Sequence, residues 1–302
     1  MALLTRESEG GRALADTIYQ TTVLARARRR KFNQRKKTIA VFTLSVFILV
    51  AVVIGGLILG EAAVTSNLAD RYIAPGAEHL FGTDQLGRDM FARTVKGLST
   101  SILIGLAASV VSAVIAAVLG SASALLGKKV DAVVTWLVDL LMGLPHIVLL
   151  VLISYALGKG FWGVTIGVAL THWPSLTRVI RGEILQLKEA NYVKIAAKMG
   201  QSPWQIAVKH MFPHVFPQFL VGLVLLFPHA ILHEAAITFL GFGLPPEAPA
   251  IGIILSESMQ YLSIGMWWLA FFPGLALLGI VALFNLAGGC LRKLLDPHSA
   301  QE

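Results

Sequence analysis

The chain has 302 residues, of which 56% are hydrophobic and 14% charged, and its mean hydropathy is +0.72. This composition excludes an ordinary soluble globular protein and indicates a polytopic membrane protein. The single cysteine, Cys290, excludes an internal disulfide and a cluster of thiolate metal ligands.

Six stretches are long and apolar enough to be transmembrane helices, since about 20 helical residues cover a bilayer core of about 30 Å. The sequence therefore predicts an all-α membrane protein with six spans. In chain order these spans cover residues 38–60, 98–126, 132–157, 161–177, 215–242 and 265–291.

The basic residues are distributed unequally between the two sides of these spans. Twenty of the 25 Lys and Arg residues fall on one side and five on the other. Because basic residues near helix ends are retained in the cytoplasm, we expect the N-terminal segment 1–37 and the tail 292–302 there. The run RARRRKFNQRKK is typical of a nucleic-acid patch in a soluble protein, but directly before a span it favours anionic lipid headgroups. Membrane lipids are thus an expected partner, and nucleic acid is not.

Three segments outside the spans are long enough to carry function. Two of them, 61–97 and 243–264, are expected on the outer face. The third, 183–213, is cytoplasmic and predicts a short helix, a stop at Gly200, a restart with Ser202 as N-cap, and a break at Pro213. Such an elbow could dock on another protein, or it could be an amphipathic connector lying on the membrane.

The elbow sequence YVKIAAKMGQSPWQIAVKHMFP resembles the EAA loop of permease subunits from binding-protein-dependent ABC importers. Gly200 and Pro213 keep the spacing of that motif, and an alanine pair precedes the glycine. Lys194 stands where the motif usually has glutamate, which removes any salt bridge that the glutamate would make. The resemblance implies coupling to an ATPase through Tyr192, Ile195, Ala196, Ala197, Met199, Gly200 and Pro213.

Three further motifs resemble one branch of these permeases, the C-type subunits of dipeptide, oligopeptide and nickel importers. They are FGTDQLGRD after the first span, FLGFGLPP after the fifth, and FNLAGGCLRKLLDP at the end of the chain. The four motifs occur in the family's order, and the resemblance extends from the first span to the C-terminus. The signature positions of the first motif are Gly82, Thr83, Asp84, Gly87, Arg88 and Asp89.

The resemblance implies a multi-pass protein of a prokaryotic inner membrane with the type I ABC importer permease fold. It also implies four partners: a B-type permease, two ATPase subunits and an extracytoplasmic solute-binding protein. ATP and magnesium would be bound by the ATPases, and we expect no cofactor on this chain. In agreement, the sequence has no GxxxxGK[ST] loop, so we expect no enzymatic activity of its own.

Ionisable residues inside the spans are candidates for the transport pathway, because such residues usually face the bundle interior or water. These candidates are His172, His229, His233 and Glu234. His229 and His233 are four residues apart and share one helix face, whereas Glu234 points about 100° away. Since neutral imidazole suits nickel, copper and zinc, the pair predicts a transient metal contact. A buried polar pair that bonds a neighbouring helix is the alternative.

We expect local structural roles for two other polar residues, both in the third span. His146 follows Pro145, which frees a backbone carbonyl at a kink that the imidazole could satisfy. Asp139 is expected to pair with a basic residue near the inner face.

For the cargo, the chain resembles the nickel and metal-chelate branch of the family at THW (Thr171 to Trp173) and at the histidine pair within PHAILHEAAITFLG. This resemblance implies nickel or a metal chelate, with a dipeptide or oligopeptide as the alternative. A secondary transporter or a channel is the alternative from another class, and it would need no ATPase-docking elbow. A membrane metalloprotease does not fit, because HExxH requires the glutamate directly after the first histidine and HAILHE has it after the second.

Overall fold

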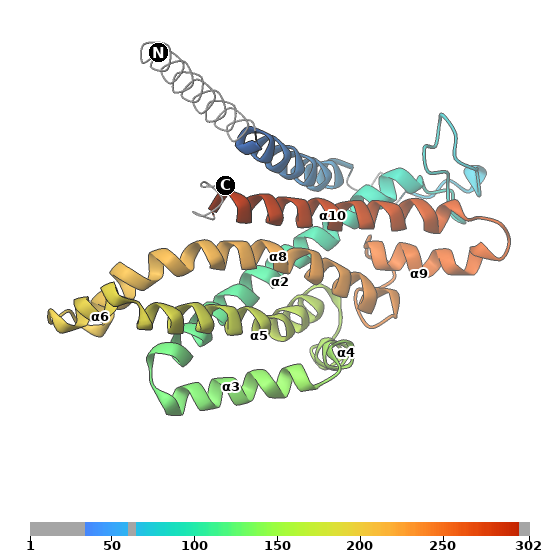
Figure 1. Cartoon of the computed structure of the whole chain (residues 1–302). Coiled ribbons are helices and arrows are strands. Elements are labelled where there is room, and N and C mark those ends of the chain that lie inside the picture. Colours follow the sequence, from blue (N-terminus) through green and yellow to red (C-terminus); the bar gives the residue numbers. More distant parts are fainter. Residues whose placement is uncertain (1–33, 60–64, 296–302) are drawn as a thin grey trace, which may run out of the picture.

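The structure is a computed structural model that describes residues 34–59 and 65–295. Within these ranges the chain is a bundle of helices without a β-strand (Figure 1). The expected basic segment up to residue 33 and the tail from residue 296 lie outside the described residues. The helices are Gln34–Leu59, α2 (Met90–Leu125), α3 (Lys128–Gly143), α4 (His146–Ala156), α5 (Gly160–Glu189), α6 (Asn191–Lys198), α7 (Pro203–Ile206), the π-helical turn η3 (Ala207–Met211), α8 (Phe212–Phe239), α9 (Ile251–Leu262) and α10 (Trp268–Leu295), with a 3₁₀ turn η2 at Leu68–Asp70.

Helix α2 is the centre of the bundle and contacts α3, α5, α8, α9 and α10. Its buried face is rich in glycine, alanine and serine, which let neighbouring helices approach closely. At Gly105 the approach is tight enough that a Cβ atom would lie 2.6 Å from Cγ1 of Ile231 in α8. The helix begins at Met90, eight residues before the expected span, because the Asp89 carboxylate accepts the N–H of Ala92 and caps it.

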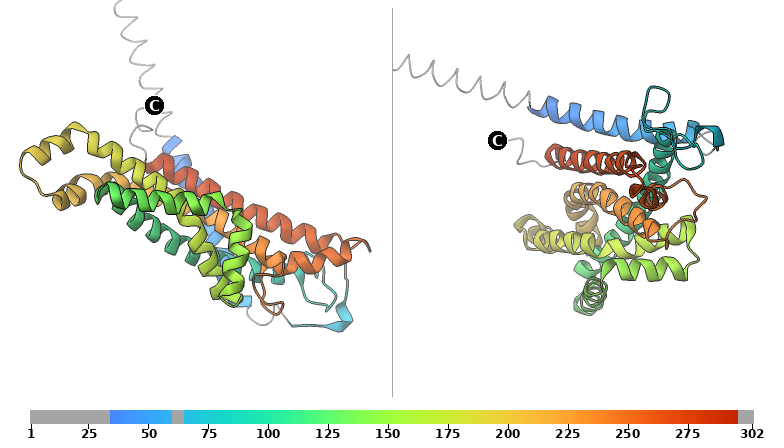
Figure 2. Two further views of the ribbon diagram at one scale, coloured as in Figure 1. Left: turned by 90° about the horizontal axis from the view of Figure 1, so that it is seen from below. Right: turned by 90° about the vertical axis from the view of Figure 1, so that its right-hand side faces the viewer.

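The third expected span is two helices rather than one. Helices α3 and α4 are bent by 98° at the break between Gly143 and His146. The cause is local, since the residue before a proline is biased away from the helical region, and Leu144 before Pro145 has ψ 145°. As a result, α4 runs across the bundle, as the view from below in Figure 2 shows.

Four helices of the described chain are long and apolar enough to cross a membrane, or five if the bent pair α3 and α4 counts as one span. Helix α5, which contains the expected span 161–177, is not among them. Its first half carries Thr165, Thr171, His172 and Trp173, all buried against neighbouring helices. Polar groups sheltered in this way lower the hydropathy of α5 without facing lipid.

The cytoplasmic elbow has the predicted start, stop and restart. Helix α6 ends before Gly200, which has φ +85°, and α7 begins with Ser202 as its N-cap in a complete capping box. The predicted break at Pro213 is wrong, because the helix continues through Pro213 into α8. The π-turn absorbs the proline: the N–H of Phe212 reaches back to the carbonyl of Ala207, five residues earlier.

The elbow and the segment 65–89 lie at opposite ends of the bundle (Figures 1 and 2). Helix α9 lies at the same end as the segment 65–89, and α10 runs from that end toward the other. Candidate residues of the two loops are therefore separated by the length of the helices.

Candidate functional site

Asp84 is the centre of the signature motif at the end of the bundle that carries segment 65–89. Its side chain is 1% exposed and accepts four hydrogen bonds. Two come from the backbone N–H groups of Leu86 (2.8 Å) and Arg88 (3.0 Å). The other two come from the guanidinium groups of Arg88 (Nε, 2.6 Å) and Arg93 (Nη1, 2.9 Å). One buried carboxylate therefore organises the loop and the first turn of α2.

Glu257 of α9 completes this ion network. Its Oε2 accepts from Nη2 of Arg93 at 2.7 Å and from Nη2 of Arg88 at 3.3 Å. The network thus joins the loop and the start of α2 to α9, whose Glu257 lies 169 residues after Arg88 in the sequence. Sequence reasoning missed Arg93 and Glu257, because neither belongs to the motif and no spacing relates them.

The other signature residues shape the same loop. The hydroxyl of Thr83 donates to the carbonyl of Asp70 and accepts the N–H of Ile73, and Asp89 also contacts His79 at 2.8 Å. Gly82 and Gly87 both have φ +71°, and a Cβ atom at Gly87 would lie 1.7 Å from the backbone oxygen of Asn67. Glycine is required at Gly87 for both reasons. The motif FGTDQLGRD therefore fixes the shape of the loop and its connection to α2.

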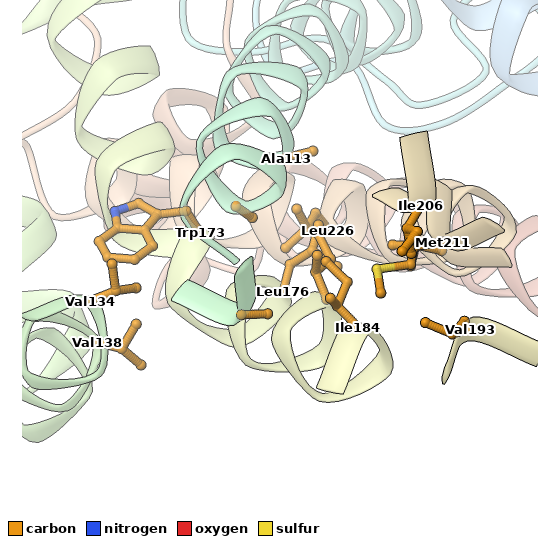
Figure 3. Close-up of a cluster of buried hydrophobic side chains, with 14 of the residues drawn as sticks. Ala113, Val134, Val138, Trp173, Leu176, Ile184, Val193, Ile206, Met211 and Leu226 are labelled. Carbon is orange, nitrogen blue, oxygen red and sulfur yellow. The ribbon is translucent and has the colours of Figure 1, made fainter. Parts of the chain in front are cut away.

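The elbow is built into the hydrophobic core at its own end of the bundle. Val193 of α6, Ile206 of α7 and Met211 of η3 pack in one buried cluster with Ile184 and Leu176 of α5 (Figure 3). The same cluster includes Val134 and Val138 of α3 and Leu226 of α8. Because interiors are close-packed, a displacement of the elbow must move α5 and α8 with it.

The opposite face of the elbow is exposed and apolar. Met199 is 78% exposed and Trp204 77%, and Ile195 and Tyr192 are also exposed. Ala197 shares this face, whereas Ala196 is buried against the chain's own core. Exposed apolar patches of this kind mark protein or membrane interaction sites, so this face fits both alternatives expected from the sequence. The remaining predicted coupling positions, Gly200 and Pro213, are exposed as well.

Lys194, the position at which the elbow departs from its motif, makes an ion pair of its own. Its Nζ lies 2.7 Å from Oε2 of Glu189 at the end of α5. The hydrogen bond from Lys194 lowers the pKa of the Glu189 carboxyl, and the charge of the ammonium adds to this effect. Both side chains are largely exposed, so the pair contributes little to stability.

Three histidines from three different helices meet in the bundle. They are His146 at the start of α4, His172 in α5 and His233 in α8. Their ring centroids are 4.5 to 4.9 Å apart, and one ring nitrogen of each lies within 4.8 Å of the others. Nε2 of His172 is 3.3 Å from Nδ1 of His233. His172 is buried, and the other two are partly buried.

The structure thus brings together only two of the four predicted pathway residues. His229 is exposed, one turn before His233, and its backbone carbonyl lies 2.8 Å from Nδ1 of His233. Glu234 is fully buried and accepts the hydroxyl of Thr238 at 3.0 Å. His146, for which a local role was expected, is the third member, because the bend after α3 carries it to α5 and α8.

The prediction that Asp139 pairs with a basic residue is confirmed. Nη2 of Arg178 in α5 donates to Oδ1 of Asp139 in α3. A cavity of about 340 Å³ lies beside this pair, and Arg181 and Thr177 also line it.

Comparison with known proteins settles the family. Residues 116–301 match the model of the "Binding-protein-dependent transport system inner membrane component". A Brucella abortus protein that carries the name of a peptide transport system permease is 36% identical over 91% of this chain and 92% of its own length. The chain belongs to the binding-protein-dependent inner membrane components. It is therefore a multi-pass permease subunit of a bacterial ABC importer, located in the inner membrane.

Other members of this family include two from Bacillus subtilis. The oligopeptide transport system permease is 35% identical over 77% of this chain and 76% of its own length. The dipeptide transport system permease is 29% identical over 89% and 84%. These names agree with peptide, the alternative expected from the sequence, and they do not support the nickel branch.

A solved structure has the same fold. A chain of the inward-facing MetNI methionine ABC transporter superposes with a TM-score of 0.58 at 18% identity, covering 68% of this chain and 98% of its own. This similarity places the present chain in the type I importer permease fold. Members of the family are transport components, which agrees with the expectation that this chain is not an enzyme.

Proposed function

We propose that this permease subunit forms half of the translocation pathway of a dipeptide or oligopeptide importer, and that an ATPase drives it through the elbow. The two faces of the elbow carry the proposal. Its buried face shares one core with α3, α5 and α8, while its exposed face presents Met199, Ile195 and Trp204 to a partner. A rigid helix held in a partner's groove moves whole helices when the partner moves.

The proposed topology has six crossings with both termini in the cytoplasm. The bent pair α3 and α4 counts as one crossing. Helix α5 adds a further crossing to the four apolar helices and the bent pair, since its 30 residues extend about 45 Å. The distribution of basic residues supports this orientation. Alkaline phosphatase fused after Lys159 should be active and after Glu189 inactive; the opposite pattern would reverse the topology.

Peptide is the proposed cargo because the similar proteins named above are peptide, oligopeptide and dipeptide permeases. The proposed partners are a B-type permease, two ATPases that hold ATP and magnesium, and an extracytoplasmic solute-binding protein. The buried Asp84 network would hold the loop rigid where the binding protein releases its cargo.

The elbow is tested by a charged substitution at Gly200. No atom lies within 4 Å of a Cβ built there, so Gly200→Glu creates no clash and places a carboxylate beside the exposed apolar face. In cells lacking the native chain, the variant chain should insert into the membrane normally but should not restore uptake of radiolabelled dipeptide. Normal uptake would contradict the coupling role.

Two control variants separate charge from backbone strain. Because Gly200 has φ +85°, any side chain adds strain of about 1–2 kcal/mol, but asparagine tolerates this region best. Gly200→Asn should therefore retain most uptake. Gly182→Glu introduces the same charge in α5, where a Cβ likewise meets nothing within 4 Å, and it should also retain uptake.

Nickel or a metal chelate is a second candidate cargo, and the histidine cluster is the observation that favours it. If the ion passes this cluster, a double variant His172→Ala with His233→Ala should reduce nickel uptake more than dipeptide uptake. Equal loss of both would assign the histidines a structural role instead.

A further inference from the structure

The three clustered histidines differ in how their ring nitrogens are used. Nδ1 of His172 lies 2.9 Å from the carbonyl of Val168, and Nδ1 of His233 lies 2.8 Å from the carbonyl of His229. A carbonyl oxygen can only accept, so Nδ1 carries the proton in both neutral rings. The lone pair of each ring is then on Nε2.

The third ring adds an unsatisfied nitrogen. Nε2 of His146 is buried and has no hydrogen-bond partner. Leaving such a buried atom unpaired is unfavourable, and a bound cation would supply the missing partner. The group includes no carboxylate, because Glu234 is hydrogen-bonded to Thr238 instead. Three neutral imidazoles therefore share one small volume.

This arrangement matches the construction of histidine metal sites. Ligating histidines usually donate their second ring nitrogen to a backbone carbonyl or a carboxylate, which fixes the tautomer and the ring orientation. His172 and His233 both do so, each to the residue four positions earlier. Imidazole ligands suit zinc, copper and nickel rather than magnesium or calcium.

We propose that His146, His172 and His233 bind one divalent transition-metal ion. A tetrahedral ion 2.0–2.1 Å from each nitrogen requires nitrogens about 3.3 Å apart. One nitrogen of each ring lies within 4.8 Å of the others, and His233 turns its Nδ1 toward Nε2 of His172 at 3.3 Å. A rotation of the partly buried His233 ring that brings its Nε2 to the ion, with a shift of about 1 Å by the partly buried His146, closes the site. Three protein ligands leave a fourth position open to water or to a ligand carried with the ion.

The site goes beyond peptide import, which needs no metal ion in the membrane. Bound metal would link the N-terminus of α4 to the first half of α5 and to the C-terminal quarter of α8. Since α4 follows the bend of 98° at Pro145, the ion would hold the crossing segment against the two helices that carry the elbow's motion.

The proposal is tested by zinc binding to the full-length chain in lipid nanodiscs, purified without a polyhistidine tag. Zn²⁺ titrated in competition with a chromophoric chelator should bind at one ion per chain. His146→Ala, His172→Ala and His233→Ala should each lower the affinity at least tenfold. His229→Ala is the matched control, because it keeps the backbone carbonyl that orients His233, and its affinity should stay within about threefold.

A second measurement does not depend on the folding of variants. Wild-type protein loaded with Co²⁺ should give a visible absorption spectrum of a low-coordinate site, and X-ray absorption should show imidazole scattering from the ion. His172→Gln, which keeps the side-chain volume, should lose both signals. No stoichiometric binding by the wild type, or equal binding by the wild type and the three alanine variants, would overturn the proposal.

Discussion

Replacing Asp84 with alanine should be among the most destabilising single changes in the segment 65–89. The substitution removes the shared acceptor of Arg88 and Arg93, whose side chains are 12% and 5% exposed. It also leaves two backbone N–H groups without a partner. Removing one partner of a buried ion pair costs about 3–5 kcal/mol, because the other charge stays buried and uncompensated.

Glu257 provides the matched comparison within the same network. The Glu257 side chain is 27% exposed, and both arginines keep their contacts with Asp84 when the Glu257 carboxylate is removed. Glu257→Ala should therefore lower the free energy of unfolding by less than about 1 kcal/mol. Asp84→Asn should fall between the two variants, since its amide keeps one accepting oxygen.

The assay is thermal unfolding of the purified full-length chain, followed by size-exclusion fluorescence. At roughly 2–4 °C per kcal/mol, Asp84→Ala should lower the Tm by about 6–20 °C, and Glu257→Ala by less than about 4 °C. A Tm for Asp84→Ala within about 2 °C of wild type would refute this reasoning. So would equal losses for the two alanine variants.

Two further predictions concern packing and capping. Gly252→Ala should destabilise by about 1–3 kcal/mol, because its Cβ would lie 2.4 Å from the backbone oxygen of Ala235 and α8 and α9 would have to separate. Gly279→Ala in α10, with nothing within 4 Å, should instead stabilise by about 0.5–1 kcal/mol; a lower Tm for both would show that helix contacts do not decide the effect. Ser202→Ala removes the N-cap of α7 at a cost of about 1 kcal/mol, so amide exchange of Gln205 should quicken about fivefold. An unchanged exchange rate would mean that the capping box does not hold the elbow.

Features that depend only on residues close together in the sequence were predictable from it. The apolar stretches located the helices because about 20 mainly apolar helical residues match the thickness of a bilayer core. The elbow followed from Gly200, which ends α6, and from Ser202, which caps α7. Four short motifs indicated the family, which comparison then established.

Only the tertiary structure decided which side chains meet. His146, His172 and His233 come from three helices, and Asp84 reaches Glu257 through two arginines across more than 160 residues. Helical spacing gives the face on which a residue lies, but not the helix that will cover that face. The bend before α4 fixes that choice for His146, and without it the histidine would remain a local feature of a proline kink. The sequence therefore determined where the apolar helices lie and where the elbow turns, while packing between distant segments determined the contacts between their polar side chains.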